Sequence, residues 1–371
     1  MNETVLTWLV FILAFGGMVI IHEFGHFIAA RLCKIEVEEF GIGLPTPGAI
    51  TLFKWQGTRF TLNWLPLGGF VRPKGENDPT VQGGLAAATP WRRFIVLVAG
   101  PAMNLLTAIV IYSFIFYRVG VPDSSRVLVN SVVTNSPAEE AGFQSGDIFI
   151  TGNGETIRSF DDLRLIVDAN AGQPIQFQVE RGGQEIEIIA TPKYFEDEQR
   201  VMIGVGLGVP FVRSSSPVET FGLGARYTMN SIRNLLSLPA QMIRGNLTPE
   251  ESRVIGLKGI YDIIGQTVSK DIEASENTNA AQPSTDPMDQ PIRTLELIAA
   301  LSVSLGVFNL FPFPALDGGR ILFLLPELIF RRRVPANVEN LVHGLGMTVL
   351  LLFMIYVNVM DFINPINVTI P

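Results

Sequence analysis

VLTWLVFILAFGGMVIIHEFGHFIAA, residues 5–30, is an apolar stretch long enough to cross a lipid bilayer, and it carries three ionisable side chains near its end. The hydrocarbon layer of a membrane is roughly 30 Å thick and takes about 20 helical residues to span. Histidine and glutamate are costly in that layer and are rarely kept there without a task. The HExxH cluster at residues 22–26 therefore predicts a polar site inside a membrane-spanning helix.

The composition of the whole chain is typical of a membrane protein. Of its 371 residues, 47% are hydrophobic and only 17% are charged, and the mean hydropathy is +0.33. No lysine or arginine precedes the stretch at 5–30, and it is too long for a signal peptide, so we expect a retained span. Further stretches of sufficient length lie at 94–119, 295–313 and 341–362. We predict a multi-pass α-helical membrane protein with four transmembrane helices.

Lysine and arginine near the spans predict the orientation, because cytoplasmic loops carry an excess of them. They gather in the loop after the first span and again at 331–333, before the last one. We expect both loops in the cytoplasm, and the segment 120–292 and both chain ends outside, in an inner or plasma membrane. The net charge of -8 argues against a nucleic-acid partner. Cys33 is the only cysteine, which excludes an internal disulfide.

The connecting segments suggest a hairpin, a small domain and a linker. Two apolar strands at 49–55 and 58–64 flank a Gln-Gly turn, which predicts a β-hairpin that dips into the membrane edge. Short strands and helices with turn residues between them predict an inserted α+β domain. We divide the chain as follows: the first span with HExxH at 1–35, a cytoplasmic membrane-associated β-hairpin region at 36–93, the second span at 94–119, the α+β domain at 122–212, juxtamembrane amphipathic helices at 217–268, a disordered linker at 269–291, a third span with a broken helix and an aspartate at 292–330, and the fourth span at 337–363.

The helix expected near 217–245 has one apolar face, with Arg226 and Arg233 elsewhere on its surface. Two interpretations are equally good: it lies on the membrane surface, or it packs on the α+β domain. The segment at 271–291 is rich in polar residues and proline and has almost no large apolar side chains, which predicts disorder.

The HExxH spacing is suited to binding a cation. On a helix, His22 and His26 lie one turn apart on one face, so both imidazoles can bind one metal ion. Glu23 lies beside that face, where it can act as a general base on water that the metal has acidified. A polar network without metal is the alternative, and the free-energy cost of these side chains in lipid argues against it.

A catalytic zinc ion needs a third protein ligand. Asp317 is favoured because its depth in the membrane fits that of His26, which lies about 8 Å inside the charged boundary, while Asp317 lies at most about 20 Å inside. Pro312 and Pro314 break the helix before it, and such a break is tolerated only around a polar cavity. The other candidates are Glu36, Glu38, Glu39 and His343.

At these residues the chain resembles the site-2 protease family of zinc intramembrane proteases, in its bacterial sigma-factor-regulating branch. The resemblance covers nearly the whole chain. Its motifs are HEFGH at 22–26, LPLGGFV at 65–71, GPAMN at 100–104, a PDZ-like pattern at 136–147 and NLFPFPALDG at 309–318.

This resemblance implies an intramembrane endopeptidase that cuts single-span membrane proteins, for example an anti-sigma factor. It implies Zn²⁺ bound by His22, His26 and Asp317, with Glu23 as general base. It also implies that the 49–64 hairpin offers an edge strand to an unwound substrate, and that one PDZ-like domain outside the cytoplasm restricts access by bulky substrates. The implied substrate-binding residues are Asn309, Pro312, Pro314 and Gly318.

Two other functional classes compete with a protease. A membrane-tethered binding module would use the PDZ-like domain, with a structural metal or none. A transporter or channel would use the polar residues as a path. The complete set of ligands and base favours the protease over both.

Overall fold

The computed structural model describes residues 2–76, 78–195, 200–213, 216–245, 253–279 and 292–365. Its contacts divide the chain into two units. The first unit contains residues 1–115, 221–276 and 291–371, and the second contains residues 116–220 and 277–290. The predicted metal ligands all belong to the first unit.

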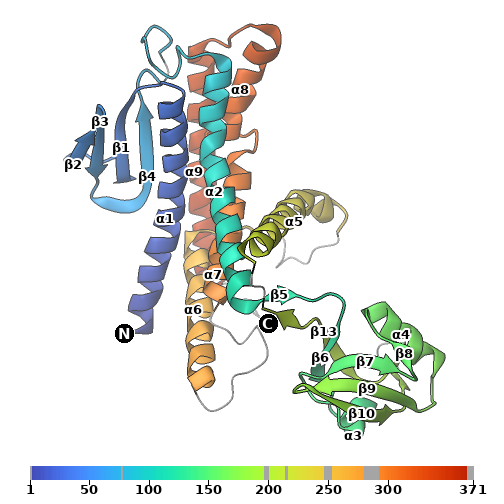
Figure 1. Cartoon of the computed structure of the whole chain (residues 1–371). Helices are drawn as coiled ribbons and strands as arrows, with labels where there is room; N and C mark the ends of the chain where they lie inside the picture. The colour runs from blue at the N-terminus through green and yellow to red at the C-terminus, as the bar shows by residue number, and fades with distance from the viewer. Residues whose placement is uncertain are drawn as a thin grey trace. The chain divides into compact units, whose positions relative to one another are not determined.

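Three long helices of the described chain are apolar enough to cross a membrane: α1 (Glu3–Leu32), α2 (Pro90–Val119) and α9 (Ala336–Ile363). They are the long rods of Figure 1. In the most apolar 18-residue segment of each helix, only 17–28% is buried inside the protein. Most of the apolar surface of these helices is therefore left to contact lipid.

The predicted third span is two helices in the structure, α7 (Arg293–Asn309) and α8 (Asp317–Phe330). The break between them contains Pro312 and Pro314, which have no backbone N–H to continue a helix. Within it, Ala315 adopts a positive φ of 82°, which is uncommon for a residue with a side chain. α8 then begins at Asp317.

Glycines allow the helices of the first unit to approach closely. A Cβ added to Gly25 of α1 would lie 2.4 Å from the carbonyl oxygen of Ala99 in α2. One added to Gly306 of α7 would lie 3.0 Å from the carbonyl oxygen of Pro101. Small residues at such contacts are how membrane helices bring their backbones together. α2 therefore packs against both α1 and α7.

A four-stranded sheet follows α1, where the sequence predicted a hairpin. Its strands are β1 (Val37–Leu44), β2 (Ile50–Trp55), β3 (Thr58–Leu62) and β4 (Leu65–Pro73), in the order β2-β3-β1-β4. β2 and β3 pair antiparallel around Gln56 and Gly57, both with positive φ. Phe27 of α1 and Phe40 of β1 lie in the core beneath the sheet, while all six residues of β2 are exposed.

The second unit contains a six-stranded sheet with two short helices, α3 (Pro137–Ala141) and α4 (Phe160–Ala169). The sheet has the path β10-β9-β7-β6-β13, and β8 pairs with β7. Phe143, Phe149 and Phe177 pack together in its core. The strands are β6 (Val127–Val132), β7 (Ile148–Gly152), β8 (Glu155–Thr156), β9 (Ile175–Arg181), β10 (Gln184–Ala190) and β13 (Val205–Gly208), and two small strand pairs join β5 (Val121–Pro122) to β14 (Phe211–Val212) and β11 (Lys193–Phe195) to β12 (Arg200–Met202).

Helices α5 (Pro217–Ile243) and α6 (Leu257–Asn279) complete the described elements. Gly224 of α5 lies against α2, because an added Cβ would be 2.4 Å from the hydroxyl of Ser113. The side of α5 that carries Gly224 therefore contacts a long helix, an arrangement that neither sequence interpretation included, while Phe221, Met229 and Leu236 of the predicted apolar face are exposed.

The predicted linker at 269–291 is wrong in its first part, because α6 extends through it to Asn279. The helix continues there because Ile272 packs on the cluster formed by Phe11, Ile264 and Val268. Asp271 also accepts hydrogen bonds from the backbone at the start of α7. Residues 280–291 of the predicted linker lie outside the described residues.

Candidate metal centre

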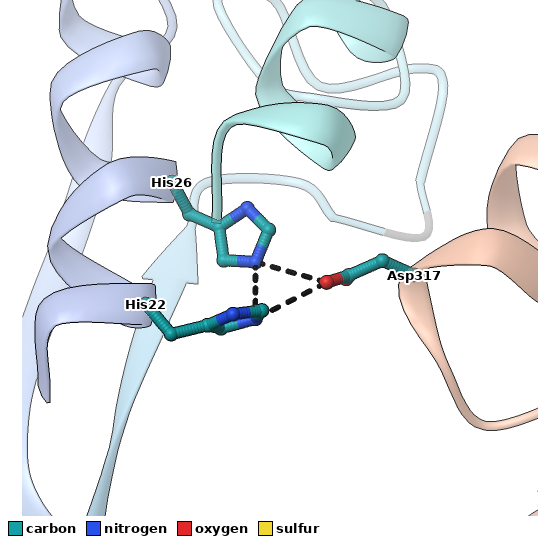
Figure 2. Close-up of side chains that lie close together, drawn as sticks. All are labelled: His22, His26 and Asp317. Atoms are coloured by element: carbon teal, nitrogen blue, oxygen red, sulfur yellow. Dashed lines mark hydrogen bonds and ion pairs between the residues drawn. The ribbon is translucent and has the colours of Figure 1, made fainter. Parts of the chain in front are cut away.

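Helix α1 places two imidazoles on one face, one turn apart. Nε2 of His22 lies 3.1 Å from Nε2 of His26, and the ring planes cross at 82°. The HExxH spacing predicted this pairing, because residues four apart on a helix share a face. His22 is buried, and both rings point from α1 toward Asp317 (Figure 2).

The first residue of α8 completes the cluster. Oδ2 of Asp317 lies 3.2 Å from Nε2 of His22 and 3.3 Å from Nε2 of His26. Figure 2 shows the carboxylate reaching across from α8 to both rings. The structure thus brings together the three residues that the sequence selected as ligands, although they come from opposite ends of the chain.

Two of the other candidates for third ligand, Glu36 and Glu39, are held in ion pairs. Glu36 forms an ion pair with Lys74, and Glu39 forms ion pairs with Arg59 and Arg72. Neither glutamate belongs to the cluster of possible ligand atoms around His22.

The three facing atoms fit a zinc ion. Ligands about 2.0 Å from a tetrahedral zinc ion lie roughly 3.3 Å from one another. The observed separations of 3.1, 3.2 and 3.3 Å match one face of such a tetrahedron. Oδ2 of Asp317 is also buried without a hydrogen-bond partner of good geometry among the described residues. Two imidazoles and one carboxylate are, in addition, a ligand set that catalytic zinc sites use.

Helix α2 orients both rings from the other side. Nδ1 of His26 lies 2.7 Å from the carbonyl oxygen of Val96. Because a carbonyl only accepts, this nitrogen carries the proton and Nε2 is left with a free lone pair. Nδ1 of His22 lies 3.2 Å from Nδ2 of Asn104.

Gly100 of α2 leaves the space that the rings occupy. A Cβ at this position would lie 2.3 Å from Nε2 of His26 and 2.8 Å from Nε2 of His22. Such distances are far below van der Waals contact. The sequence showed Gly100 only as part of a motif, and its role follows from the folded arrangement.

Glu23 lies between the ligand cluster and the sheet. Its Oε2 accepts a hydrogen bond from the backbone N–H of Val71 in β4, at 3.1 Å. Its charge is also within electrostatic range of His22, His26 and Asp317. The carboxylate is therefore held by one oxygen, which leaves Oε1 available for proton transfer.

The four predicted substrate-binding residues lie in different surroundings. Pro312 is exposed and Asn309 is half-buried, so both are accessible. Pro314 packs against Gly346 of α9, where an added Cβ would lie 2.3 Å from it. Gly318 is buried under the break, because an added Cβ would lie 2.2 Å from the carbonyl oxygen of Phe311.

His343 takes part in the architecture of the site without joining the ligands. Its Nδ1 accepts a hydrogen bond from the backbone N–H of Ala315, at 2.9 Å. Ala315 is the residue with φ of 82°, two positions before Asp317. The sequence could only offer His343 as a third ligand, since nothing local to α9 reveals this contact.

Comparisons with known proteins identify the family of this chain. The model of peptidase family M50 matches residues 10–353. A candidate zinc metalloprotease of Clostridium perfringens is 34% identical to the chain, over 96% of this chain and 98% of the relative. Metalloprotease MmpA of Caulobacter vibrioides is 28% identical over 91% of each protein. The crystal structure of a PDZ domain from an SdrC-like protein of Listeria monocytogenes aligns with 22% of this chain and 85% of that domain, at 18% identity and a TM-score of 0.21.

Proposed function

This chain belongs to peptidase family M50 and is a zinc metalloprotease, and we propose that it cleaves peptide bonds within the membrane-spanning segments of other proteins. The observation that carries the proposal is the triangle of Nε2 of His22, Nε2 of His26 and Oδ2 of Asp317, with sides of 3.1–3.3 Å. Two of its three members lie within a helix apolar enough to span a membrane.

We assign four membrane crossings, with α7 and α8 together forming the third. α7 has 17 residues and is followed by a break, so by length it is too short to count as a full span on its own. α8 adds 14 residues and ends just before the arginines at 331–333. These arginines favour a cytoplasmic end for α8.

We propose that the membrane is an inner or plasma membrane. The excess of lysine and arginine expected in cytoplasmic loops favours a zinc site near the cytoplasmic side. The α+β domain of the second unit would then lie outside the cytoplasm. We propose that it is PDZ-like and restricts the access of substrates with bulky external domains.

The site residues have distinct roles in this reaction. His22, His26 and Asp317 hold zinc, which supplies Lewis acidity toward a peptide carbonyl and toward water when bound. Glu23 takes a proton from the attacking water and passes it to the leaving nitrogen. The N–H of Val71 keeps the carboxylate of Glu23 in place between the two events.

The free edge of β4 is the better candidate for substrate pairing. The sequence suggested the 49–64 hairpin as the edge strand, but β2 lies at the edge of the sheet farthest from β4. Val71 pairs with Phe40 of β1, yet its N–H points to Glu23 and thus to the other side of β4. Gly69 pairs with Ile42, two residues along from the pair of Val71 and Phe40. Because the direction of backbone hydrogen bonds alternates with a period of two residues, the backbone groups of Gly69 also face this open edge. An unwound substrate that adds a strand here would bring its carbonyl groups to Glu23.

Asn309 and Pro312 are accessible at the end of α7, and we assign them to the positioning of the substrate together with Pro314 and Gly318. The substrates we propose are single-span membrane proteins, such as a membrane-tethered anti-sigma factor. Their helices must unwind, because a helical carbonyl is shielded by its own hydrogen bond.

The decisive experiment compares two glutamate variants of the full chain, reconstituted with a single-span substrate. Glu23→Gln should keep zinc and fold but lose cleavage by at least about a hundredfold, as expected for a general base. Glu36→Gln is the control, because Glu36 pairs with Lys74 on the surface. Cleavage by Glu23→Gln at the wild-type rate would show that Glu23 is not the base, and cleavage that survives zinc chelation would refute the proposal as a whole.

A further inference from the structure

One face of α2 carries a series of groups that contact the imidazoles. Val96, Gly100 and Asn104 follow at intervals of four residues, so they lie on the same side of the helix. Val96 accepts from His26 through its carbonyl, and Gly100 leaves space for both rings. Asn104 is the group that faces His22.

We propose that Asn104 is the positioning residue of the metal centre, which accepts the Nδ1–H of His22 and thereby directs Nε2 of that ring to zinc. This inference rests on the proposed function, since it assumes that His22 is a ligand. A neutral imidazole that binds a metal through Nε2 carries its proton on Nδ1. That proton needs an acceptor, because metal-binding histidines almost always donate their second N–H.

The amide of Asn104 can supply this acceptor. In the structure its Nδ2 lies 3.2 Å from Nδ1 of His22, so the end of the amide is within hydrogen-bond reach of that ring nitrogen. Its Oδ1 is buried and has no hydrogen-bond partner among the described residues. Nothing in that part of the chain therefore holds the amide against a half-turn, which exchanges Oδ1 and Nδ2 at almost constant shape. After the turn, Oδ1 meets the Nδ1–H of the zinc-bound ring.

The backbone at Asn104 is fixed, so that only the amide has to turn. Its carbonyl oxygen accepts a hydrogen bond from the hydroxyl of Ser302 in α7, at 2.8 Å. Both Asn104 and Ser302 are completely buried. Asn104 therefore connects α2 to α7 and to His22 of α1. The chain continues from α7 to Asp317.

An asparagine suits this role because it is neutral. With two neutral imidazoles and one carboxylate, the zinc site keeps one net positive charge, which a carboxylate at position 104 would cancel. Aspartate at 104 would nonetheless keep an acceptor oxygen for Nδ1–H. The two properties, acceptor and charge, can therefore be separated by substitution.

The test measures the zinc dissociation constant of the purified full chain by competition with a chromophoric chelator. Asn104→Leu removes the acceptor at similar volume and should weaken zinc binding by about ten- to a hundredfold. Asn104→Asp should bind zinc within a few-fold of the wild type. Thr107→Val is the control on the same helix, because the Thr107 hydroxyl donates to Met103 of α2 itself, and it should leave the constant unchanged.

The absorption spectrum of the cobalt-substituted protein gives a second readout that does not depend on activity. Asn104→Asp should retain the wild-type ligand-field bands, and Asn104→Leu should shift them, because His22 is no longer held in one orientation. Asn104→Ala replaces the leucine variant if the latter does not fold.

Three results would contradict these assignments in different ways. Zinc binding by the leucine or alanine variant as tight as that of the wild type would overturn the role of Asn104. Equal losses in the leucine and aspartate variants would overturn it too, because the acceptor would then be irrelevant. A wild-type chain that binds no zinc, or a His22→Ala variant that binds it equally well, would overturn the proposed function itself.

Discussion

The backbone N–H of Val71 donates a hydrogen bond to Oε2 of Glu23, and so joins the sheet directly to the HExxH helix. Val71 is paired with Phe40 of β1, and because its N–H donates to Glu23, this N–H points to the side of β4 away from β1. Glu23 therefore stands at the edge where an additional strand would form. In the proposed reaction, backbone geometry thus sets the position of Glu23 relative to an extended substrate.

Two phenylalanines, one on each edge strand, allow a matched test of where the substrate lies. Phe70 belongs to β4 and is half-buried, and Phe53 belongs to β2 and is 54% exposed. We expect benzoylphenylalanine at position 70, in the Glu23→Gln background, to crosslink a single-span substrate on irradiation. The same group at position 53 should give little product. Stronger crosslinking from position 53 than from position 70 would show that the substrate pairs with β2 and not with β4.

Gly100→Ala should disrupt the metal centre. The new Cβ would lie 2.3 Å from Nε2 of His26, a nitrogen that faces the ligand cluster, so the ring has to move. We expect at least a tenfold weaker affinity for zinc, as for other changes that disturb ligand orientation. Gly17→Ala is the matched control on α1, because an added Cβ there meets nothing within 4 Å. Equal zinc affinities in the two variants would disprove the close packing of α2 on the rings.

His343→Leu should impair catalysis while leaving zinc in place. It removes the acceptor of the Ala315 N–H and so releases a strained segment two residues before Asp317. An unsatisfied donor costs about 1–3 kcal/mol, and if this cost shifts the loop we expect kcat/KM to fall by roughly five- to a hundredfold. Thr348→Val on the same helix should have no effect, since its hydroxyl donates within α9. A large loss of zinc from His343→Leu would instead indicate a direct role as ligand.

An ion pair between a buried aspartate and a partly exposed arginine stabilises the second unit. Asp147 is completely buried and accepts two hydrogen bonds from Arg181, at 2.6 and 2.7 Å, which raise the pKa of the arginine. Asp147→Ala should lower the stability of this unit by about 1–3 kcal/mol, because the guanidinium of Arg181 and the backbone N–H of Gln144 lose their acceptor. Hydrogen exchange of amides in β7 and β9 measures the change. Arg164→Ala, which breaks an exposed pair with Asp168, should cost less than about 0.5 kcal/mol.

Acid should loosen the start of α4. The pKa of Asp162 is lowered because the backbone N–H of Arg158 and the hydroxyl of Ser159 hydrogen-bond to its carboxylate. A carboxyl with a lowered pKa in the folded state stabilises the fold above its unfolded pKa, about 4, and loses this effect as the pH falls below it. The protection factors of amides in α4, which compare the exchange rate with the intrinsic rate at the same pH, should therefore fall below about pH 4. If Asp162→Asn shows the same pH dependence as the wild type, another group is responsible.

The ligand cluster could be predicted because each step depended on a short-range rule. A spacing of four residues fixes the two imidazoles on one face of α1. Asp317 was predicted as the third ligand from its depth in the third predicted span and from the prolines that precede it. The contacts of Asn104 and His343 could not be predicted, because they join helices that are far apart in the sequence and have no local signature.

The sheet shows the limit of strand patterns. In β2 and β3, apolar residues alternate with polar ones or follow one another, and both strands were predicted from this pattern. β1 and β4 were not predicted. β1 contains Glu39, and β4 contains Gly68 and Gly69, which interrupt any strand pattern. β1 forms because Glu39 is neutralised by Arg59 and Arg72 and because Phe40 packs on Phe27 of α1. Such partners become visible only after the chain has folded.

The division of the cluster between α1 and α8 has a consequence for biosynthesis. A ribosome adds almost three hundred residues after His26 before it reaches Asp317. With the ligand set proposed above, the nascent chain offers a cation only the two histidine nitrogens until α8 has been synthesised, and we expect it not to hydrolyse neighbouring polypeptides during that time. Proteolytic competence thus arises only when membrane insertion is nearly finished.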